Sequence, residues 1–221
     1  NNGHQVTVWS ALEDEIRLLQ EKHEQTSKLP GVILADSVSF TTSLKEAVKG
    51  RDLLVLAVPS PFVRSTAHQL RDVVEEKQII VNVAKGIEEK TLMTLSEVIE
   101  EEIPQAQVAV LSGPSHAEEV GKGVPTTIVA GAKTRSAAEK IQNIFMSPVF
   151  RVYTSPDVLG IELGAALKNV VALAAGIADG LGYGDNTKAA LITRGITEIA
   201  RLGTAMGGSG KHFSGCPVSG I

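Results

Sequence analysis

The chain has 221 residues, of which 43% are hydrophobic and 21% charged, so it is long enough and apolar enough for one large or two smaller globular domains. A formal net charge of −4 without any basic block argues against a nucleic-acid or anionic-membrane partner. The single cysteine, Cys216, excludes an internal disulfide, and we find neither a signal peptide nor an uncharged apolar run of about 18 residues, so we expect a cytoplasmic protein without membrane insertion.

Strand-like and helix-like patterns alternate through the first part of the chain, which indicates an α/β fold with a Rossmann-type, doubly wound parallel sheet. The expected strands are 4–9, a short strand at the start of 38–50, 52–59, 78–86, 107–115, 126–132 and 150–155. The expected helices are 12–23, the end of 38–50 closed by Gly50, 62–74, 91–103 and 136–146. The run 52–59 is almost wholly apolar and ends at a proline, which predicts a central strand buried on both faces.

Strand signals stop after the last of these strands. Two helical stretches rich in Ala, Gly and Leu follow, at 157–184 and 186–207. The sequence therefore predicts a boundary near residue 155, with a Rossmann-type domain at 1–155 and an all-α domain at 156–221.

Three of the predicted strands end in residues suited to an anionic ligand. They end at Val58-Pro59-Ser60, at Ala84-Lys85-Gly86 and at Ser112-Gly113-Pro114-Ser115-His116. In open α/β sheets ligands bind beyond the carboxyl ends of the strands, and we expect all three to lie at the same edge. Each of them taken alone is equally consistent with an ordinary turn.

Lys168 lies in the middle of the apolar helix "IELGAALKNVVALAAGIADG" (161–180). None of its neighbours at helical spacing is an acid; they are Gly164, Ala165, Val171 and Ala172. The lysine therefore either extends to solvent or has an anionic or reacting partner.

A second polar group stands at the start of the last predicted helix. Its members are Asp185, Asn186, Thr187, Lys188 and Arg194. These residues suit a helix cap with surface charges, and they also suit a phosphate site at a helix N-terminus.

Several stretches together resemble the bacterial NAD(P)-dependent glycerol-3-phosphate dehydrogenase family, from residue 1 to about Phe213. They are "LAVPSPFVR", "NVAKGIE", "LSGPSHAEEV", "PTTIVAG", "GIELGAALKNVVALAAGIADGLGYGDNTKAALITRG" and "EIARLGTAMG". The resemblance implies a dinucleotide-binding domain followed by a helical substrate domain, with NAD or NADP as cofactor. It also implies interconversion of sn-glycerol 3-phosphate and dihydroxyacetone phosphate, in glycerophospholipid precursor synthesis.

The resemblance also assigns roles to residues. Lys168 matches the family's proton acceptor. Lys85 matches a position that contacts substrate and cofactor. Its ammonium would be a second cation in the site, and a second cation lowers the pKa of a nearby lysine. Gly113 and Ser115 match substrate-binding positions. Four further residues lie in family motifs and are expected to orient Lys168 or to hold the substrate and its phosphate: Asn169, Asp185, Thr187 and Arg194. The expected cofactor contacts are Ser10, Pro59, Lys85 and Ala117, and Ser10 suits the ribose of either NAD or NADP.

The resemblance fails at both ends of the chain. The family's Gly-x-Gly-x-x-Gly fingerprint belongs ahead of Asn1, and "KHFSGCPVSGI" (211–221) departs from the family after Phe213. We expect a missing N-terminal piece, because the strand at 4–9 would otherwise have no neighbour, and an incomplete C-terminal part.

Two alternatives remain open: a related dehydrogenase of β-hydroxy acids or 6-phosphogluconate, and a non-catalytic fragment. The partner we expect is a small-molecule substrate, with a homodimer through the helical domain. No metal is expected, since the five histidines are scattered.

Overall fold

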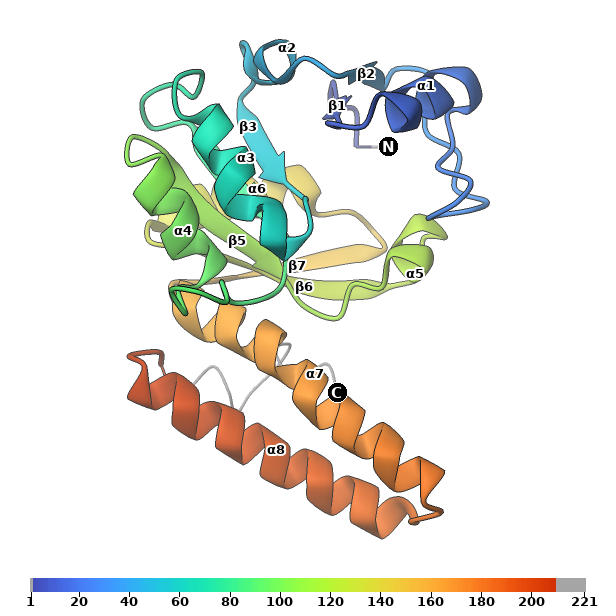
Figure 1. Ribbon diagram of the computed structural model, residues 1–221, viewed down its shortest axis with the longest axis vertical. Coiled ribbons are helices and arrows are strands. Elements are labelled where there is room, and N and C mark those ends of the chain that lie inside the picture. Colours follow the sequence, from blue (N-terminus) through green and yellow to red (C-terminus); the bar gives the residue numbers. More distant parts are fainter. Residues whose placement is uncertain (1, 210–221) are drawn as a thin grey trace.

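The structure is a computed structural model that describes residues 2–209 of the chain (Figure 1). Cys216, His212 and the divergent stretch 211–221 lie outside the described residues. Within them, an α/β part is followed by two long helices.

Seven strands in the described part of the chain form two sheets. They are β1 (Thr7–Trp9), β2 (Ser39–Thr41), β3 (Leu53–Leu56), β4 (Ile79–Asn82), β5 (Gln107–Ser112), β6 (Thr126–Ala132) and β7 (Phe150–Ser155). β1 and β2 pair in parallel, and the other five form one sheet in the order β3-β4-β5-β6-β7. Every predicted strand region contains one of these strands.

One pairing differs from the predicted parallel sheet, because β6 runs antiparallel to β5. β6 in turn pairs in parallel with β7. The prediction was wrong here because a short apolar run shows that a strand is present without showing which way it runs.

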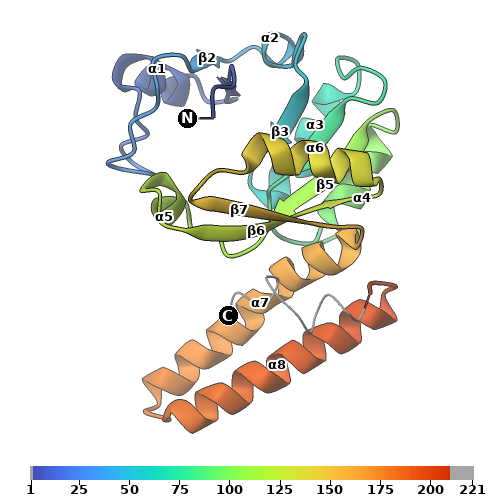
Figure 2. The ribbon, with the colours of Figure 1, turned by 180° about the vertical axis from the view of Figure 1, so that it is seen from behind.

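Helices cover both faces of the five-stranded sheet, with α3 and α4 on one face and α6 on the other (Figures 1 and 2). The helices are α1 (Glu13–Lys22), α2 (Leu44–Val48), α3 (Val63–Leu70), α4 (Leu95–Glu102), α5 (Ala117–Gly121), α6 (Arg135–Phe145), α7 (Val158–Gly180) and α8 (Asp185–Ala205), with a 3-10 turn η1 (Ser60–Phe62). The β4 neighbours Ile80 and Val81 show the two layers: Ile80 packs in the cluster of α3 and α4, and Val81 in that of α6. The sheet is therefore doubly wound, as predicted. The short elements η1 and α5 were not predicted.

β3 lies at the edge of its sheet, although the sequence predicted a central strand buried on both faces. Among the described residues β3 pairs only with β4, and Val55 is 47% exposed. Its other edge faces a cavity of about 1650 Å³ that β1 also lines. β1 pairs with β2, so the strand at 4–9 has a neighbour on one side, whereas the sequence predicted that it would have none unless a further N-terminal piece precedes it.

α7 connects the sheet to the helical part. The Asp157 side chain caps it by accepting a hydrogen bond from the Gly160 N–H at 3.0 Å. Its first turns pack under the sheet, where Ile161 contacts Val110 and Val129. Within residues 2–209, α7 is the one helix that is long and apolar enough to cross a membrane, a test of length and composition that core helices also meet. Its first turns are buried against the sheet and Val171 is buried toward α8, whereas Val170, Leu173 and Ile177 are exposed. The domain boundary near residue 155 stays a prediction.

Arg64 of α3 gathers three glutamates from two other segments. It forms a two-pronged pair with Glu88, with both N–O distances 2.8 Å, and it also pairs with Glu101 and Glu102 of α4 at 2.6 and 2.9 Å. Glu88 lies in the loop after β4, so the cluster fastens this loop to α3 and α4. The hydrogen bonds from Arg64 hold the pKa of Glu88 at about 2, below its ordinary value of 4.5.

We expect Gly195→Ala to destabilise the fold by about 1–3 kcal/mol through overpacking, despite a gain in helix propensity of roughly 1 kcal/mol. A Cβ at Gly195 of α8 would lie 2.6 Å from the Val171 Cγ2 atom of α7. The matched control is Gly176→Ala on α7, where a Cβ meets nothing within 4 Å, so this variant should gain up to roughly 1 kcal/mol. Urea unfolding measures both free energies, and equal stabilities for the two variants would contradict this account of the α7–α8 contact.

We expect Glu88→Gln to lower stability at neutral pH and to flatten its acid dependence. The folded-state pKa of Glu88 lies below the ordinary value, so the ionised pair stabilises the fold above about pH 4.5 and that contribution is lost as the pH falls toward about 2. Urea unfolding between pH 7 and pH 3 measures the slope. The control is Glu89→Gln, because the exposed Glu89 side chain has no ion pair or hydrogen bond with the described residues. If the stability of Glu88→Gln changes with pH as steeply as that of the wild type, the Arg64–Glu88 pair contributes nothing to stability.

Candidate active site

Three loops meet at the carboxyl ends of β3, β4 and β5. These strands are parallel neighbours, so their ends lie at one edge of the sheet, as the sequence predicted. Gly86, with φ at +145°, approaches Ser60 so closely that a Cβ would lie 3.1 Å from the Ser60 Cβ and Oγ atoms. The Lys85 Nζ atom donates to the Gly113 carbonyl at 3.1 Å. The first loop thus touches the second, and the second is hydrogen-bonded to the third.

The loop after β5 presents small residues and hydroxyl groups. The Gly113 carbonyl accepts from Lys85 and also from the Ser115 Oγ–H at 3.4 Å. A Cβ at Gly113 would lie 3.1 Å from the Thr127 carbonyl oxygen of β6, so glycine permits a close backbone approach here. The buried Ser112 hydroxyl has no hydrogen-bond partner among the described residues. Such an orphaned group at a strand end is suited to a bound molecule.

Lys168 of α7 is partly buried and lies near Lys85. Burial lowers the pKa of the Lys85 amine, and the positive charge of Lys168 lowers it further. We call Lys85 and Lys168 the lysine pair. Neither side chain forms an ion pair with a carboxylate in residues 2–209. Two close cations without acidic partners make a favourable place for an anion such as a phosphate.

Two further polar residues, neither of them predicted from the sequence, lie on the segments that carry the lysine pair. Glu162 on α7 and Asn82 at the end of β4 are buried, and the Asn82 Nδ2 atom donates to the Glu162 Oε1 atom at 3.4 Å. A signal for Glu162 was present in the sequence, because it is a second charged residue in the same apolar helix as Lys168.

The expected cofactor contacts all follow strands. Ser10 comes after β1, Pro59 after β3 and Lys85 after β4, and Ala117 opens α5 beyond β5. The Ser10 hydroxyl donates to the Glu15 carboxylate at 2.9 Å, and the Pro59 carbonyl accepts from the Phe62 N–H at 2.9 Å. The cofactor role of these four residues stays a prediction.

The other expected substrate residues lie on the helical hairpin. Asn169 is exposed beside Lys168, and Arg194 pairs with Glu198 along α8 at 2.8 Å. Asp185 and Thr187 lie in the first turn of α8, beyond the far end of α7. Lys168 is roughly 18 Å from that end at about 1.5 Å per residue, so the structure does not bring these two residues to the lysine pair.

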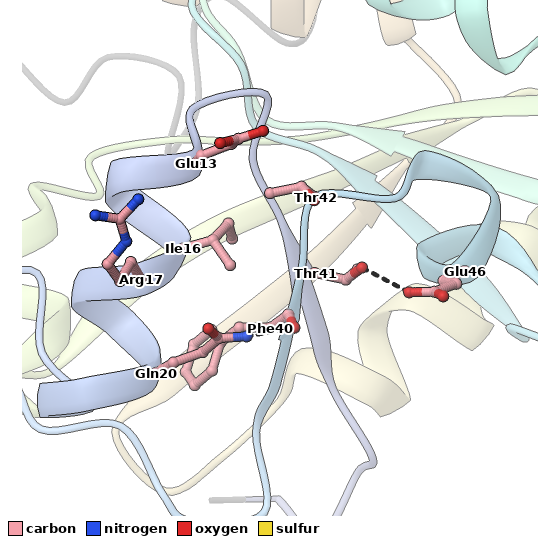
Figure 3. Close-up of a pocket in the computed structure, with 8 residues that line it drawn as sticks. All are labelled: Glu13, Ile16, Arg17, Gln20, Phe40, Thr41, Thr42 and Glu46. Carbon is pink, nitrogen blue, oxygen red and sulfur yellow. Dashed lines mark hydrogen bonds between the residues drawn. The ribbon is translucent and has the colours of Figure 1, made fainter.

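A smaller pocket of about 450 Å³ lies between α1 and β2, at the opposite end of the molecule from α7 (Figures 1 and 3). Ile16 and Phe40 line it, and Thr41 donates to Glu46 at 2.7 Å (Figure 3). It holds the acids Glu13 and Glu46 in addition to Arg17, which makes it a poorer place for a phosphate than the lysine pair. Within the described part of the chain, no cluster of three or more His, Cys, Asp or Glu residues could hold a metal ion.

Comparison with known proteins confirms the resemblance. A family model described as NAD-dependent glycerol-3-phosphate dehydrogenase N-terminus matches residues 1–138, and one described as the C-terminus of that enzyme matches residues 157–220. A relative named glycerol-3-phosphate dehydrogenase (NAD(P)+) from Agathobacter rectalis is 65% identical over 97% of this chain and 64% of its own length. One of the same name from Fusobacterium nucleatum is 58% identical over the same shares.

A solved structure agrees with the fold. Glycerol-3-phosphate dehydrogenase from Coxiella burnetii matches with a TM-score of 0.91 at 31% identity, covering 99% of this chain and 66% of that one. The chain spans 64% of the length of the two curated relatives. With one family model covering more than half of its residues, the chain belongs to the NAD-dependent glycerol-3-phosphate dehydrogenase family.

Proposed function

We propose that this chain interconverts sn-glycerol 3-phosphate and dihydroxyacetone phosphate with NAD or NADP. The observation that carries the proposal is the lysine pair, in which Lys85 from the loop after β4 and Lys168 from α7 lie together without acidic partners among the described residues. Both substrates carry a phosphate and an oxygen at C2. Two cations, one toward the phosphate and one at the C2 oxygen, suit this chemistry.

The substrate side is formed by Lys85, Gly113, Ser115 and Lys168. Lys85 attracts the phosphate, and an anion beside it offsets the repulsion from Lys168. Ser115 and the Gly113 backbone offer hydrogen bonds at the same edge. Asn169 and Arg194 are assigned supporting roles on the helical side. Asp185 and Thr187 lie at the far end of the hairpin and are left out of the proposed contacts with this substrate.

The residues at the strand ends fit a dinucleotide. The orphaned Ser112 hydroxyl lies next to the Gly113 backbone, and the cofactor candidates Ser10, Pro59 and Ala117 follow β1, β3 and β5. When bound, NAD(P) accepts a hydride from C2 of the substrate. Nothing at Ser10 selects between NAD and NADP.

Lys168 moves the proton. In the oxidation, its neutral amine takes the proton of the C2 hydroxyl as the C2 hydride and its electron pair leave, so that a C2 carbonyl forms. In the reduction, the Lys168 ammonium returns that proton to the C2 oxygen. During this proton transfer, Lys85 and the loop after β5 bind the phosphate of the substrate and fix its position.

The cellular setting follows from the proposed reaction. We place the protein in the cytoplasm, where the sn-glycerol 3-phosphate that it forms supplies glycerophospholipid synthesis. The homodimer, and the absence of nucleic-acid partners and of membrane insertion, stay predictions.

We expect Lys168→Ala to reduce turnover of dihydroxyacetone phosphate about 10²–10⁴-fold, because the proton donor is lost. The measurement is oxidation of NADH and of NADPH by the full-length protein. Lys45→Ala is the matched control, since Lys45 is exposed on α2, far from α7, and should turn over like the wild type (Figure 1).

Two results would count against the proposal. Equal activity of Lys168→Ala and the wild type would remove Lys168 from its role. A full-length wild type that reduces a β-hydroxy acid's keto form but not dihydroxyacetone phosphate would overturn the substrate assignment.

A further inference from the structure

Glu162 is a buried acid in an apolar helix, only 6% exposed. A buried carboxylate is costly unless hydrogen bonds replace its water. Its Oε1 atom accepts from the Ser96 N–H at 3.0 Å and from Asn82 at 3.4 Å, and its Oε2 atom accepts from the Ser96 hydroxyl. The carboxylate is thus held by two segments outside its own helix.

The first of these segments is the start of α4. Thr94 and Glu97 cap α4 in a capping box, and the Ser96 N–H in the same first turn is left for Glu162. The positive end of the helix dipole favours a carboxylate at this place. Glu162 therefore fastens α7 to the N-terminus of α4.

The second segment leads directly to Lys85. The Asn82 side chain folds the chain after β4, because its Oδ1 atom accepts from the Ala84 N–H at 3.0 Å and its Nδ2 atom donates to the Ala84 carbonyl at 3.2 Å. The same Nδ2 atom donates to Glu162. The turn that presents Lys85 is therefore tied to the helix that presents Lys168.

A purely stabilising role explains these contacts less well. Apolar side chains of similar size often stabilise a core as much as a buried ion does, without its desolvation cost. The arrangement here joins the two segments that carry the lysine pair, and burial raises the pKa of Glu162 against the opposing hydrogen bonds.

We propose that Glu162 is a positioning residue that, through Asn82, fixes the Lys85 turn against α7 and so sets the separation of Lys85 and Lys168. Its effect on turnover rests on the proposed function. Its effect on the lysine pair does not, because that is a property of the protein without substrate or cofactor.

The test is the titration of Lys85, followed by NMR of ¹³C-dimethylated lysines in the full-length protein and assigned with Lys85→Arg. In the wild type the pKa of Lys85 lies below its ordinary value of 10.5. Glu162→Leu and Asn82→Ala should both let it rise toward 10.5. Glu162→Gln should keep the wild-type titration, because its amide oxygen can still accept from Ser96 and Asn82.

Thr134→Ala is the matched control. Thr134 caps α6 on the opposite face of the sheet by accepting from the Ala137 N–H at 3.3 Å, so its loss destabilises the protein without touching the lysine pair. The titration of Lys85 should not move in this variant. In activity assays, Glu162→Leu and Asn82→Ala should lose about 10²-fold in kcat, the scale of a 1 Å misplacement, and Glu162→Gln should retain it.

Each remaining outcome decides the proposal. A wild-type Lys85 titration in Asn82→Ala overturns it, and this variant decides the matter if Glu162→Leu does not fold. If the pKa of Lys85 shifts as much in Glu162→Gln as in Glu162→Leu, the positioning role is overturned, because the charge of the Glu162 carboxylate then accounts for the effect. If the wild type fails to reduce dihydroxyacetone phosphate, the proposed function falls while the titration still tests the role of Glu162.

Discussion

Two ammonium groups held near each other in a partly buried place repel, and the candidate site is built around this repulsion. Lys85 is held by its hydrogen bond to the Gly113 carbonyl, and Lys168 by the packing of α7 under the sheet. Each is attached to a different element, so the repulsion acts on the junction between the sheet and α7. Glu162 and Asn82 lie at that junction and connect its two sides. A ligand phosphate would reduce the repulsion between Lys85 and Lys168. Anion binding would therefore stabilise the contact between the sheet and α7, and an intact contact would in turn favour anion binding.

Much of this site could be predicted from the sequence because its parts obey local rules. Strand-like patterns located each strand of the described residues, and the parallel order of β3, β4 and β5 brought Pro59, Lys85 and Gly113 to one edge. Lys168 was conspicuous as a charge in an apolar helix. The direction of β6 and the edge position of β3 could not be predicted. Both depend on which strands pair with them, and the residues of a single strand do not identify its partners.

The residues that were missed show the same limit at the level of side chains. Asn82, Ser96 and Glu162 come from a strand end, a helix start and another helix, and their hydrogen bonds join residues up to 80 positions apart. Asn82 and Ser96 have unremarkable local roles when taken alone, and Glu162 is marked in the sequence only as a second charge in the apolar helix of Lys168. Asp185 and Thr187 show the converse: they share a distinctive stretch of sequence with the region of Lys168 but lie at the far end of the helical hairpin, and their role stays a prediction.

The substrate side and the cofactor side of the site differ in what holds them. Lys85, Gly113 and Lys168 depend on β4, β5 and α7, which pack as one continuous unit through Val110 and Ile161. The cofactor candidates Ser10 and Pro59 belong to different sheets, with the cavity of about 1650 Å³ between β1 and β3. Whatever fixes the distance between these two edges also sets the span available to a dinucleotide. The proposed phosphate contacts at the lysine pair therefore depend on packing within residues 2–209, whereas the proposed cofactor contacts depend on how the two sheets are held relative to each other.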